Sequence, residues 1–569
     1  METSISKATI RNWQRLSTEK DTRLKSRANK TLSEKYIVPV EYYQRPKNKY
    51  FSSEIVDMMK TEQLTIASVV YQIACELLSN AGILKHQHVK KVLDEFKKNN
   101  EISEVTFPLT IPDDERDILG ITYQSLLVEG EKNKKGSYYT PENVVEEMTK
   151  KIDLKEKVIL DPCCGSGSFL LSIPCEDPRQ LVGFDNDEIA VFITKINLLL
   201  KFNNLEFEPQ VYVRDFLNDQ LSDFANKFDY IITNPPWGAL PKGFKNTEIN
   251  SKETFSHFLV HSKKFLKKNG CLIYLLPESF LNVKTHKDLR RYVLDNYEIK
   301  NIHVYDKLFA GVTTKYISIQ LELGKQHDLI EVYRGELSWK VLIDAFYQTE
   351  NYNYNLIAVE DYHLIEKIKE KKRFDLKDSE WALGIVTGDN KNKLKNNMDS
   401  GLEPIYTGKE ITAYQLLAPK KFIRYDRENF QQVAKDEIYR AKEKLVYKFI
   451  SKKLVFAYDK DGSLFLNSAN ILIPNTKNAS IKTIMALLNS TLYAYIYTCL
   501  FGEIKILRGN LEELPFPKIS MKQDNEISDL VANYLEKQDP MILRKLDKVI
   551  YQLFDLTPKE IQLVEKTFA

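Results

Sequence analysis

The tetrapeptide Asn234-Pro235-Pro236-Trp237 carries groups that could activate an aromatic amine. The asparagine oxygen and the carbonyl of Pro235, which the next proline fixes, can both accept hydrogen bonds from an exocyclic amine. Trp237 adds a flat face for stacking. An aromatic amine is a poor nucleophile because its lone pair is delocalised into the ring, and two acceptors on its hydrogens favour the pyramidal geometry needed for attack. We therefore count all four residues as candidate catalytic residues, with a plain strand-end turn as the alternative.

A glycine-rich loop earlier in the chain could lie against a ligand. Residues 161–169 read Asp-Pro-Cys-Cys-Gly-Ser-Gly-Ser-Phe and follow the apolar run 158–160. Gly165 and Gly167 let the backbone pass close to a bound molecule, and a helix that begins near Ser168 presents free amide groups. Because no Lys-Ser or Lys-Thr follows the glycines, we do not expect a nucleoside-triphosphate loop.

Acidic side chains stand at the ends of two later apolar runs. Residues 181–184 lead into Asp185, about twenty positions beyond the glycine loop, where a carboxylate can accept both hydroxyls of a ribose. Residues 211–213 lead to Asp215 and Phe216, which offer a carboxylate to an adenine amine and an aromatic neighbour to its ring. A single aspartate after a strand is usually a helix cap. Three acidic ends in series, followed by the Asn-Pro-Pro-Trp strand, favour one binding site.

The elements that must position these residues are strands and helices in alternation. Residues 228–233 predict a buried strand that delivers the tetrapeptide to the carboxyl edge of a sheet, where α/β sheets bind ligands. Thr140 and Pro141 predict the cap and the first position of a helix with an apolar face over residues 144–148. Further strands are expected at 271–277 and, as a hairpin whose connection carries Phe309, at 301–306 and 316–323.

The amino-terminal part of the chain shows helical periodicity. The apolar spacing over residues 53–100 predicts a helical region. Within it, Glu95-Phe96-Lys97 has the Glu-x-Lys spacing of metal-dependent nucleases, but those sites lie on strands with an upstream aspartate, so we expect no nuclease site here. Residues 5–13 fit either a helix-turn-helix or a basic helix packed on another part of the protein.

Length and composition set limits on the class of protein. A chain of 569 residues is long enough for two to four domains. No apolar run approaches about eighteen residues and the first twenty residues are too polar for a signal peptide, so we expect a cytoplasmic protein without a membrane segment. Six cysteines without Cys-x-x-Cys pairing predict neither a metal site nor a disulfide framework. The net charge is +3, and residues 1–50 hold twelve Lys/Arg against five Asp/Glu.

Residues 105–325 resemble the gamma-class N6-adenine DNA methyltransferases of restriction-modification systems. In that family a Gly-x-Tyr-Tyr-Thr-Pro segment, here residues 136–141, precedes an Asp-Pro-x-x-Gly-x-Gly-x-Phe loop, here 161–169, and Asn-Pro-Pro-aromatic follows, here 234–237. The resemblance implies an α/β fold with a Rossmann-like domain that uses S-adenosyl-L-methionine as its cofactor. It also implies site-specific methyl transfer to N6 of a flipped adenine. The aromatic residue is Trp rather than the commoner Tyr or Phe, which still supplies a stacking face.

The resemblance assigns roles by matching position. The residues that it implies around the methionine part of the cofactor are Thr140, Asp161, Gly165 and Gly167. Those implied at the ribose and adenine are Asp185, Asp215 and Phe216. Those implied at the target base are Asn234, Pro235, Trp237 and Phe309. The expected cofactor-binding set also contains Tyr139, Cys163, Asn186 and Asn234. Double-stranded DNA is the expected partner, and whether a separately encoded cognate restriction endonuclease accompanies it stays open.

Five segments divide the chain in this interpretation. They are a helical amino-terminal region (1–104), the catalytic domain (105–330), a linking helical stretch (331–370), a mixed α+β target-recognition domain (371–520) and a carboxyl-terminal helical region (521–569). The fourth resembles the carboxyl-terminal recognition domains of restriction-modification enzymes. Its basic and aromatic residues suit phosphate contacts and intercalation, with a solvated strand face as the alternative: Lys420, Lys421, Phe422, Arg424, Tyr425 and Arg427.

Other activities are compatible with parts of this pattern. Asn-Pro-Pro-aromatic also occurs in methyltransferases that act on release-factor glutamine or on ribosomal RNA, and the long carboxyl-terminal region favours DNA over both. Cytosine N4 is disfavoured because Asn stands where that group usually has Ser. A non-catalytic specificity subunit with a methyltransferase fold is a third alternative, and the intact acidic strand ends argue against it. A fused nuclease lacks a convincing motif.

Overall fold

The structure is a computed structural model that describes residues 35–36, 38, 43–104, 110–112, 114–135, 140–150, 152, 155–240, 248–305, 315–502 and 505–567. The expectations for residues 5–13, for Tyr139 and for Phe309 lie outside the described residues. The described chain forms two compact units, the first ending at Leu356 and the second beginning at Ile357.

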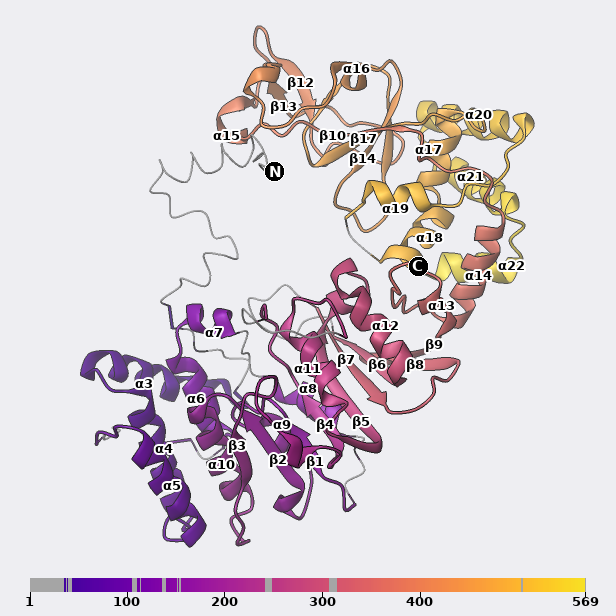
Figure 1. Cartoon of the computed structure of the whole chain (residues 1–569). Helices are drawn as coiled ribbons and strands as arrows, with labels where there is room; N and C mark the ends of the chain where they lie inside the picture. The colour runs from indigo at the N-terminus through magenta and orange to yellow at the C-terminus, as the bar shows by residue number, and fades with distance from the viewer. Residues whose placement is uncertain are drawn as a thin grey trace, which may run out of the picture. The chain divides into compact units, whose positions relative to one another are not determined.

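The first unit is built on a nine-stranded sheet in the order β3-β2-β1-β4-β5-β7-β6-β8-β9 (Figure 1). Strands β3, β2, β1, β4 and β5 run parallel to one another, and β7 runs antiparallel between β5 and β6. The strands are β1 (Ile159–Asp161), β2 (Leu181–Asp185), β3 (Gln210–Val213), β4 (Phe228–Thr233), β5 (Leu266–Pro277), β6 (Glu298–Tyr305), β7 (Tyr316–Glu322), β8 (Leu329–Arg334) and β9 (Leu337–Leu342). This is the α/β fold that the sequence predicts, and the hairpin of β6 with β7 is confirmed.

Helices surround this sheet, and several of them form the amino-terminal part of the first unit before β1. They are α3 (Lys49–Glu62), α4 (Ile66–Asn80), α5 (Gln87–Asn99), α6 (Ile118–Leu126), α7 (Glu129–Lys135), α8 (Glu142–Thr149), α9 (Ser168–Ser172), α10 (Glu188–Lys201), α11 (Thr254–Ser262), α12 (Lys287–Asn296) and α13 (Asp344–Tyr347). Helices α4 and α5 pack on α10, where the rings of Phe96 and Phe192 stack with centroids 3.9 Å apart. The helical prediction for 53–100 is confirmed, and Glu95 lies on α5, where it pairs with Lys195.

Two local expectations are wrong. The segment 331–370 contains a strand pair rather than only helix, because β8 and β9 form an antiparallel hairpin that closes the edge of the sheet. Its turn contains Gly335, which has a φ of 56°. Thr140 does not cap a helix: Pro141 is the N-cap of α8, and no side chain caps that end. The Thr140 hydroxyl instead takes part in the site described below.

The second unit holds two four-stranded sheets, ordered β10-β17-β14-β15 and β11-β13-β12-β16. Its strands are β10 (Glu380–Leu383), β11 (Leu394–Lys395), β12 (Glu403–Tyr406), β13 (Lys421–Ile423), β14 (Lys444–Lys448), β15 (Phe456–Asp459), β16 (Leu464–Phe465) and β17 (Ala469–Ile473). Side chains alternate across β14, so Leu445 packs in the core shared with the helices and Val446 in the core shared with the second sheet. The first sheet is thus covered on both faces.

Helices form the rest of this unit. They are α14 (Val359–Glu370), α15 (Asn390–Lys393), α16 (Asp436–Tyr439), α17 (Ile481–Asn489), α18 (Thr491–Phe501), α19 (Arg508–Glu513), α20 (Met521–Lys537), α21 (Pro540–Leu553) and α22 (Pro558–Lys566). The mixed α+β character and the helical tail agree with the sequence interpretation. Among the described residues no single helix is long and apolar enough to cross a membrane; α17 and α18, bent by 63°, pass that test only as a pair, and most of their side chains are buried.

Candidate active site

The carboxyl ends of four adjacent strands meet at one cavity of about 320 Å³. Asp161 ends β1, Asp185 ends β2, Asp215 follows β3 and Asn234 follows β4. All four line the cavity. Successive parallel strands place their carboxyl ends at one edge, so residues 73 positions apart in sequence (161 to 234) reach a common site. The volume falls within the range of pockets that enclose small-molecule ligands.

Most of the predicted site residues lie on the wall of this cavity. Those that line it are Thr140, Asp161, Cys163, Gly165, Asp185, Asn186, Asp215, Phe216, Asn234 and Pro236. Gly167, Pro235 and Trp237 do not line it. Gly167 has a φ of 91°, and a Cβ there would meet the methyl of Thr194 at 2.9 Å, so its part is to let the loop pass α10. Tyr139 and Phe309 lie outside the described residues.

The glycine loop is held in place by the carboxylate at the end of β2. Gly165 donates its backbone N–H to one oxygen of Asp185 at 2.8 Å, and Asp187 donates its own to the other at 2.9 Å. The carbonyl of Gly165 accepts from the Thr194 hydroxyl at 2.6 Å. The loop conformation is therefore fixed from both sides before any ligand enters, which reduces the ordering cost of binding.

Asp161 is a buried carboxylate without a cationic partner among the described residues. It is 1% exposed, and its Oδ1 accepts from the Thr233 hydroxyl at 2.7 Å and from the Cys163 amide at 3.2 Å. Neither bond reaches Oδ2, and no described residue donates to it. Burial raises the pKa of Asp161 to about 7. The Cys163 thiol lies 2.9 Å from Thr233 Oγ1, and burial keeps the pKa of this thiol well above its usual value.

Asp215 and Phe216, which follow β3, form the end of the cavity opposite Asp161. Asp215 Oδ1 accepts from the amides of Leu217 and Asn218 at 3.0 and 3.2 Å, so the residue does cap the following turn. Phe216 is 1% exposed and packs among other rings, with centroids 5.2 Å from Phe258 and 5.1 Å from Phe265. The two residues give this end an acceptor beside an aromatic wall, which suits a purine with an exocyclic amine.

Asn234 is oriented by a residue from the segment before α8. Its Nδ2 donates to Thr140 Oγ1 at 3.1 Å, across 94 positions of sequence. This contact turns the amide nitrogen toward Thr140 and the carbonyl oxygen to the opposite side of the carboxamide. Trp237 packs against Tyr316, with ring centroids 4.9 Å apart and an interplanar angle of 35°. Its indole nitrogen is buried and has no hydrogen-bond partner among the described residues.

Helix α6 supplies cavity residues that the motifs do not indicate. Tyr123, Gln124 and Leu127 line the cavity. Tyr123 donates its hydroxyl to Asp187 Oδ2 at 2.6 Å. Asp117 caps α6 through Gly120 at 2.9 Å, accepts from the Asn197 amide at 2.7 Å and hydrogen-bonds the Ser166 hydroxyl in the glycine loop. The sequence signal available was an aspartate cap before an all-apolar turn, which does not specify these partners.

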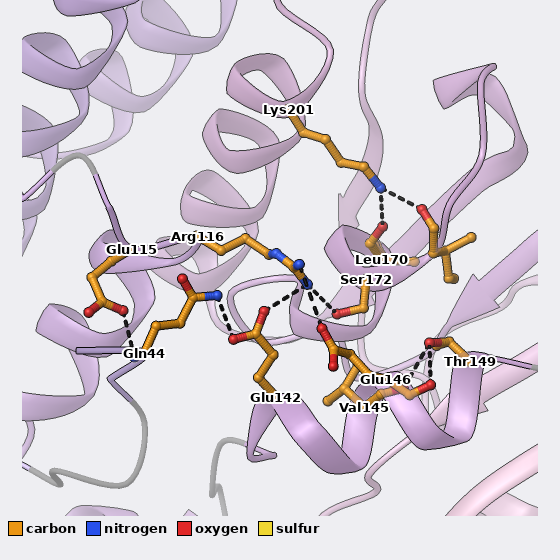
Figure 2. Close-up of polar contacts among 11 residues, drawn as sticks. Gln44, Glu115, Arg116, Glu142, Val145, Glu146, Thr149, Leu170, Ser172 and Lys201 are labelled. Carbon is orange, nitrogen blue, oxygen red and sulfur yellow. Dashed lines mark hydrogen bonds and ion pairs between the residues drawn. The ribbon is translucent and has the colours of Figure 1, made fainter. Parts of the chain in front are cut away.

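A polar cluster beside α6 fixes the start of α8 (Figure 2). Arg116 pairs with Glu142 at 2.9 Å and donates to Ser172 at 3.2 Å, and Gln44 donates to the other Glu142 oxygen at 2.5 Å. Lys201 donates to the carbonyl of Ile173 at 2.5 Å. Because Thr140 stands two residues before Glu142, the cluster holds the segment that orients Asn234.

Two sequence families match the chain. The N-6 DNA Methylase family matches residues 114–383, and the TaqI-like C-terminal specificity domain matches residues 403–516. The type II methyltransferase M.VspI of Vibrio sp. (strain 343) is 32% identical over 345 residues, which cover 58% of this chain and 81% of that protein. The methylase subunit of the type I restriction enzyme EcoEI of Escherichia coli is 27% identical over 245 residues, which cover 39% of this chain and 48% of that protein.

Solved structures agree in fold. The type IIL restriction-modification enzyme MmeI in complex with DNA matches with a TM-score of 0.54 at 14% identity, covering 83% of this chain and 82% of that one. The DrdV-DNA complex matches with a TM-score of 0.50 at 12% identity, covering 87% and 69%. The resemblance drawn from the motifs is thus confirmed, and the chain belongs to the N-6 DNA methylase family as a restriction-modification DNA adenine methyltransferase with a carboxyl-terminal specificity domain.

Proposed function

We propose that this protein transfers the methyl group of S-adenosyl-L-methionine directly to N6 of an adenine that is flipped out of double-stranded DNA at a defined sequence. The observation that carries the proposal is that Asn234 lies on the wall of the cavity formed by Asp161, Asp185 and Asp215. An acceptor for the target amine and the acceptors for a charged nucleoside cofactor are thereby within one site.

The residues of the cavity fit this cofactor. Asp185 lies where its oxygens can accept ribose hydroxyls, and Asp215 with Phe216 suits the adenine ring. Asp161, whose Oδ2 accepts no bond from a described residue, suits the ammonium of the amino-acid part. When bound, the cofactor supplies an electrophilic methyl on a sulfonium. Its positive charge matches a cavity that holds several carboxylates and, among its described lining residues, a single cation, Arg214.

The chain's own part in the reaction is to hold and orient the target amine. The carboxamide oxygen of Asn234 and the carbonyl of Pro235 accept the two N6 hydrogens and draw the nitrogen toward pyramidal geometry. Thr140 keeps the Asn234 amide in this orientation. The proton leaves to solvent after attack, so the step needs no strong base.

Adenine must leave the duplex to reach this site, at a cost of a few kcal/mol. Stacking on an aromatic side chain offsets roughly 1 to 3 kcal/mol per base. Trp237 packs against Tyr316, which supports the indole as a platform for the base. We assign Phe309, from the family resemblance, as the second aromatic side chain beside the target base. The specificity domain would read the sequence, and a cognate endonuclease would be a separate partner in a restriction-modification system.

The test is transfer of labelled methyl to plasmid DNA by wild type and by Asn234→Ala, followed by nucleoside analysis and mapping of modified bases. We expect N6-methyladenine in one recurring sequence, and a loss of turnover by orders of magnitude in the variant with cofactor affinity nearly unchanged. Asn250→Ala is the matched control, since Asn250 is exposed and its side chain hydrogen-bonds only Asp288 among the described residues. Near-normal turnover of Asn234→Ala contradicts the assignment.

A further inference from the structure

Gln124 of α6 is a buried amide on the wall of the cofactor cavity. It is 3% exposed and lines the cavity together with Tyr123 and Leu127. No described residue forms a hydrogen bond with its side chain. The amide therefore keeps its hydrogen-bonding capacity for a molecule in the cavity. We propose that Gln124 binds the carboxylate of the amino-acid part of S-adenosyl-L-methionine, an inference that rests on the cofactor of the proposed function.

The charge of the cavity makes such a donor necessary. Its described lining residues include four carboxylates, those of Asp161, Asp185, Asp187 and Asp215, against the guanidinium of Arg214. Arg214 is exposed and adjacent to Asp215, which is the adenine end. A ligand carboxylate at the Asp161 end therefore meets like charges, and only neutral donors can hold it there.

The hydroxyl side chains at that end offer at most one donor each, and two of them already take part in hydrogen bonds. The Ser166 hydroxyl is bonded to Asp117, and Thr140 Oγ1 accepts from Asn234. Ser168 is only partly buried. Gln124 offers two N–H donors to a carboxylate from a side chain that is only 3% exposed.

The orientation of α6 favours a position of Gln124 beside the amino-acid part of the cofactor rather than beside its ribose. Tyr123 faces Asp187, which follows the β2 carboxyl end, whereas Ile121 lies one turn before Gln124 on the same helix face. Ile121 lines a small neighbouring cavity with Thr140 and Ser168. The Ile121–Gln124 edge of α6 is therefore the edge next to Thr140. Asp161 and Gln124 together then provide an acceptor for the ammonium and a donor for the carboxylate of one amino acid.

The experiment compares two probes on purified full-length protein by calorimetry. S-adenosylhomocysteine carries the amino-acid part, and 5′-methylthioadenosine lacks it. Gln124→Met keeps the side-chain volume and removes the amide, so we expect its Kd for S-adenosylhomocysteine to rise about tenfold or more, as for loss of a hydrogen bond to a charged group. Gln124→Glu adds a like charge, so we expect a larger rise. The Kd for methylthioadenosine should stay within about twofold in both variants.

Thr122→Val is the control within the same helix. Thr122 is fully buried and its hydroxyl contacts Ser52 at 2.9 Å, so this change perturbs α6 on another face. Its Kd for both probes should match wild type. The inference is overturned if Gln124→Met binds S-adenosylhomocysteine like wild type, or if methylthioadenosine loses affinity equally. Failure of the wild type itself to bind S-adenosylhomocysteine would instead refute the cofactor of the proposed function.

Discussion

Asp161 and Asp459 are both buried aspartates at the last position of a strand, one in each unit, yet their surroundings differ. Asp459 ends β15 and lies opposite Lys444 in the register of β14, with Lys444 Nζ 2.6 Å from its carboxylate. It also accepts from the amide and hydroxyl of Ser463 at 3.0 Å. Asp161 has only a hydroxyl and an amide. Asp459 thus has a buried cation beside it in the core of the second unit, whereas Asp161 in the cavity has no cation among the described residues.

The largest expected effect is on the paired aspartate. Lys444→Met leaves Asp459 buried without its cation, and we expect a loss of about 3 to 5 kcal/mol in the stability of the carboxyl-terminal unit. Lys444 is itself fully buried, and burial lowers its pKa, so water does not replace the pairing. Calorimetric melting of the full chain measures the loss.

The double variant Lys444→Met/Asp459→Asn serves as the control for this prediction. It removes both charges and should recover a large part of the lost stability, because a neutral amide costs far less to bury than a carboxylate. Binding of S-adenosylhomocysteine should persist in both variants at low temperature. A single variant that melts like wild type would show that the pair is not a determinant of this unit's stability.

Replacing the unpaired aspartate should have the opposite effect on stability from Lys444→Met. The pKa of Asp161 is about 7 in the folded protein, above its unfolded value of about 3.9. Between these values the folded state keeps a proton that the unfolded state has lost, so this group's contribution to stability is full below about pH 4 and is lost as the pH rises through about 7. Asp161→Asn should abolish that slope, and it should not lower the melting temperature at pH 8.

Cofactor binding separates this prediction from a simple packing effect. If Asp161 accepts the ligand ammonium, Asp161→Asn should weaken S-adenosylhomocysteine by about tenfold or more, in line with a lost charged hydrogen bond. Wild-type affinity should fall as the pH drops below about 7, because the carboxyl must ionise to bind the ammonium. An affinity that is flat from pH 6 to 8 in the wild type would contradict the assignment.

The contrast also explains which parts of the site can be predicted from the sequence. Strand ends such as Asp185 and Asn234 follow apolar runs, and the strand period places them at one sheet edge whatever the tertiary detail. Gln124 and Asp117 could not be found this way, because long-range packing brings α6 to the cavity: Asp117 hydrogen-bonds Ser166 across 49 positions of sequence. The hairpin of β8 and β9 is not predicted from the sequence, although Ile330 and Val332 alternate with exposed neighbours, because two six-residue strands give a weak signal.

The same reasoning revises the basic residues of the specificity domain. Arg427 suits phosphate contact by sequence alone, but it pairs with Asp436 and donates to the carbonyl of Ala434 at 2.8 Å, so its charge is already compensated. Lys421 donates to Asn396 at 2.5 Å. Asn396 is neutral, so this bond leaves the Lys421 charge uncompensated, and Arg424 has no hydrogen-bond or ion-pair partner among the described residues. We therefore predict that Lys421 and Arg424, rather than Arg427, keep their charges for phosphate contact.

The smallest expected effect belongs to the exposed ion pair of this domain. Arg427→Ala removes the cation beside Asp436, yet water and the Tyr425 hydroxyl, 2.6 Å from Asp436 Oδ1, continue to solvate that carboxylate. We therefore expect a loss below about 1 kcal/mol in the same melting experiment, against the several kcal/mol for Lys444→Met. Arg427 and Lys444 each pair with an aspartate in one unit and differ in burial, so the ratio of the two losses isolates desolvation as the cause. Equal losses would mean that pairing rather than burial sets the energy, and the distinction between Asp459 and Asp161 would then need another explanation.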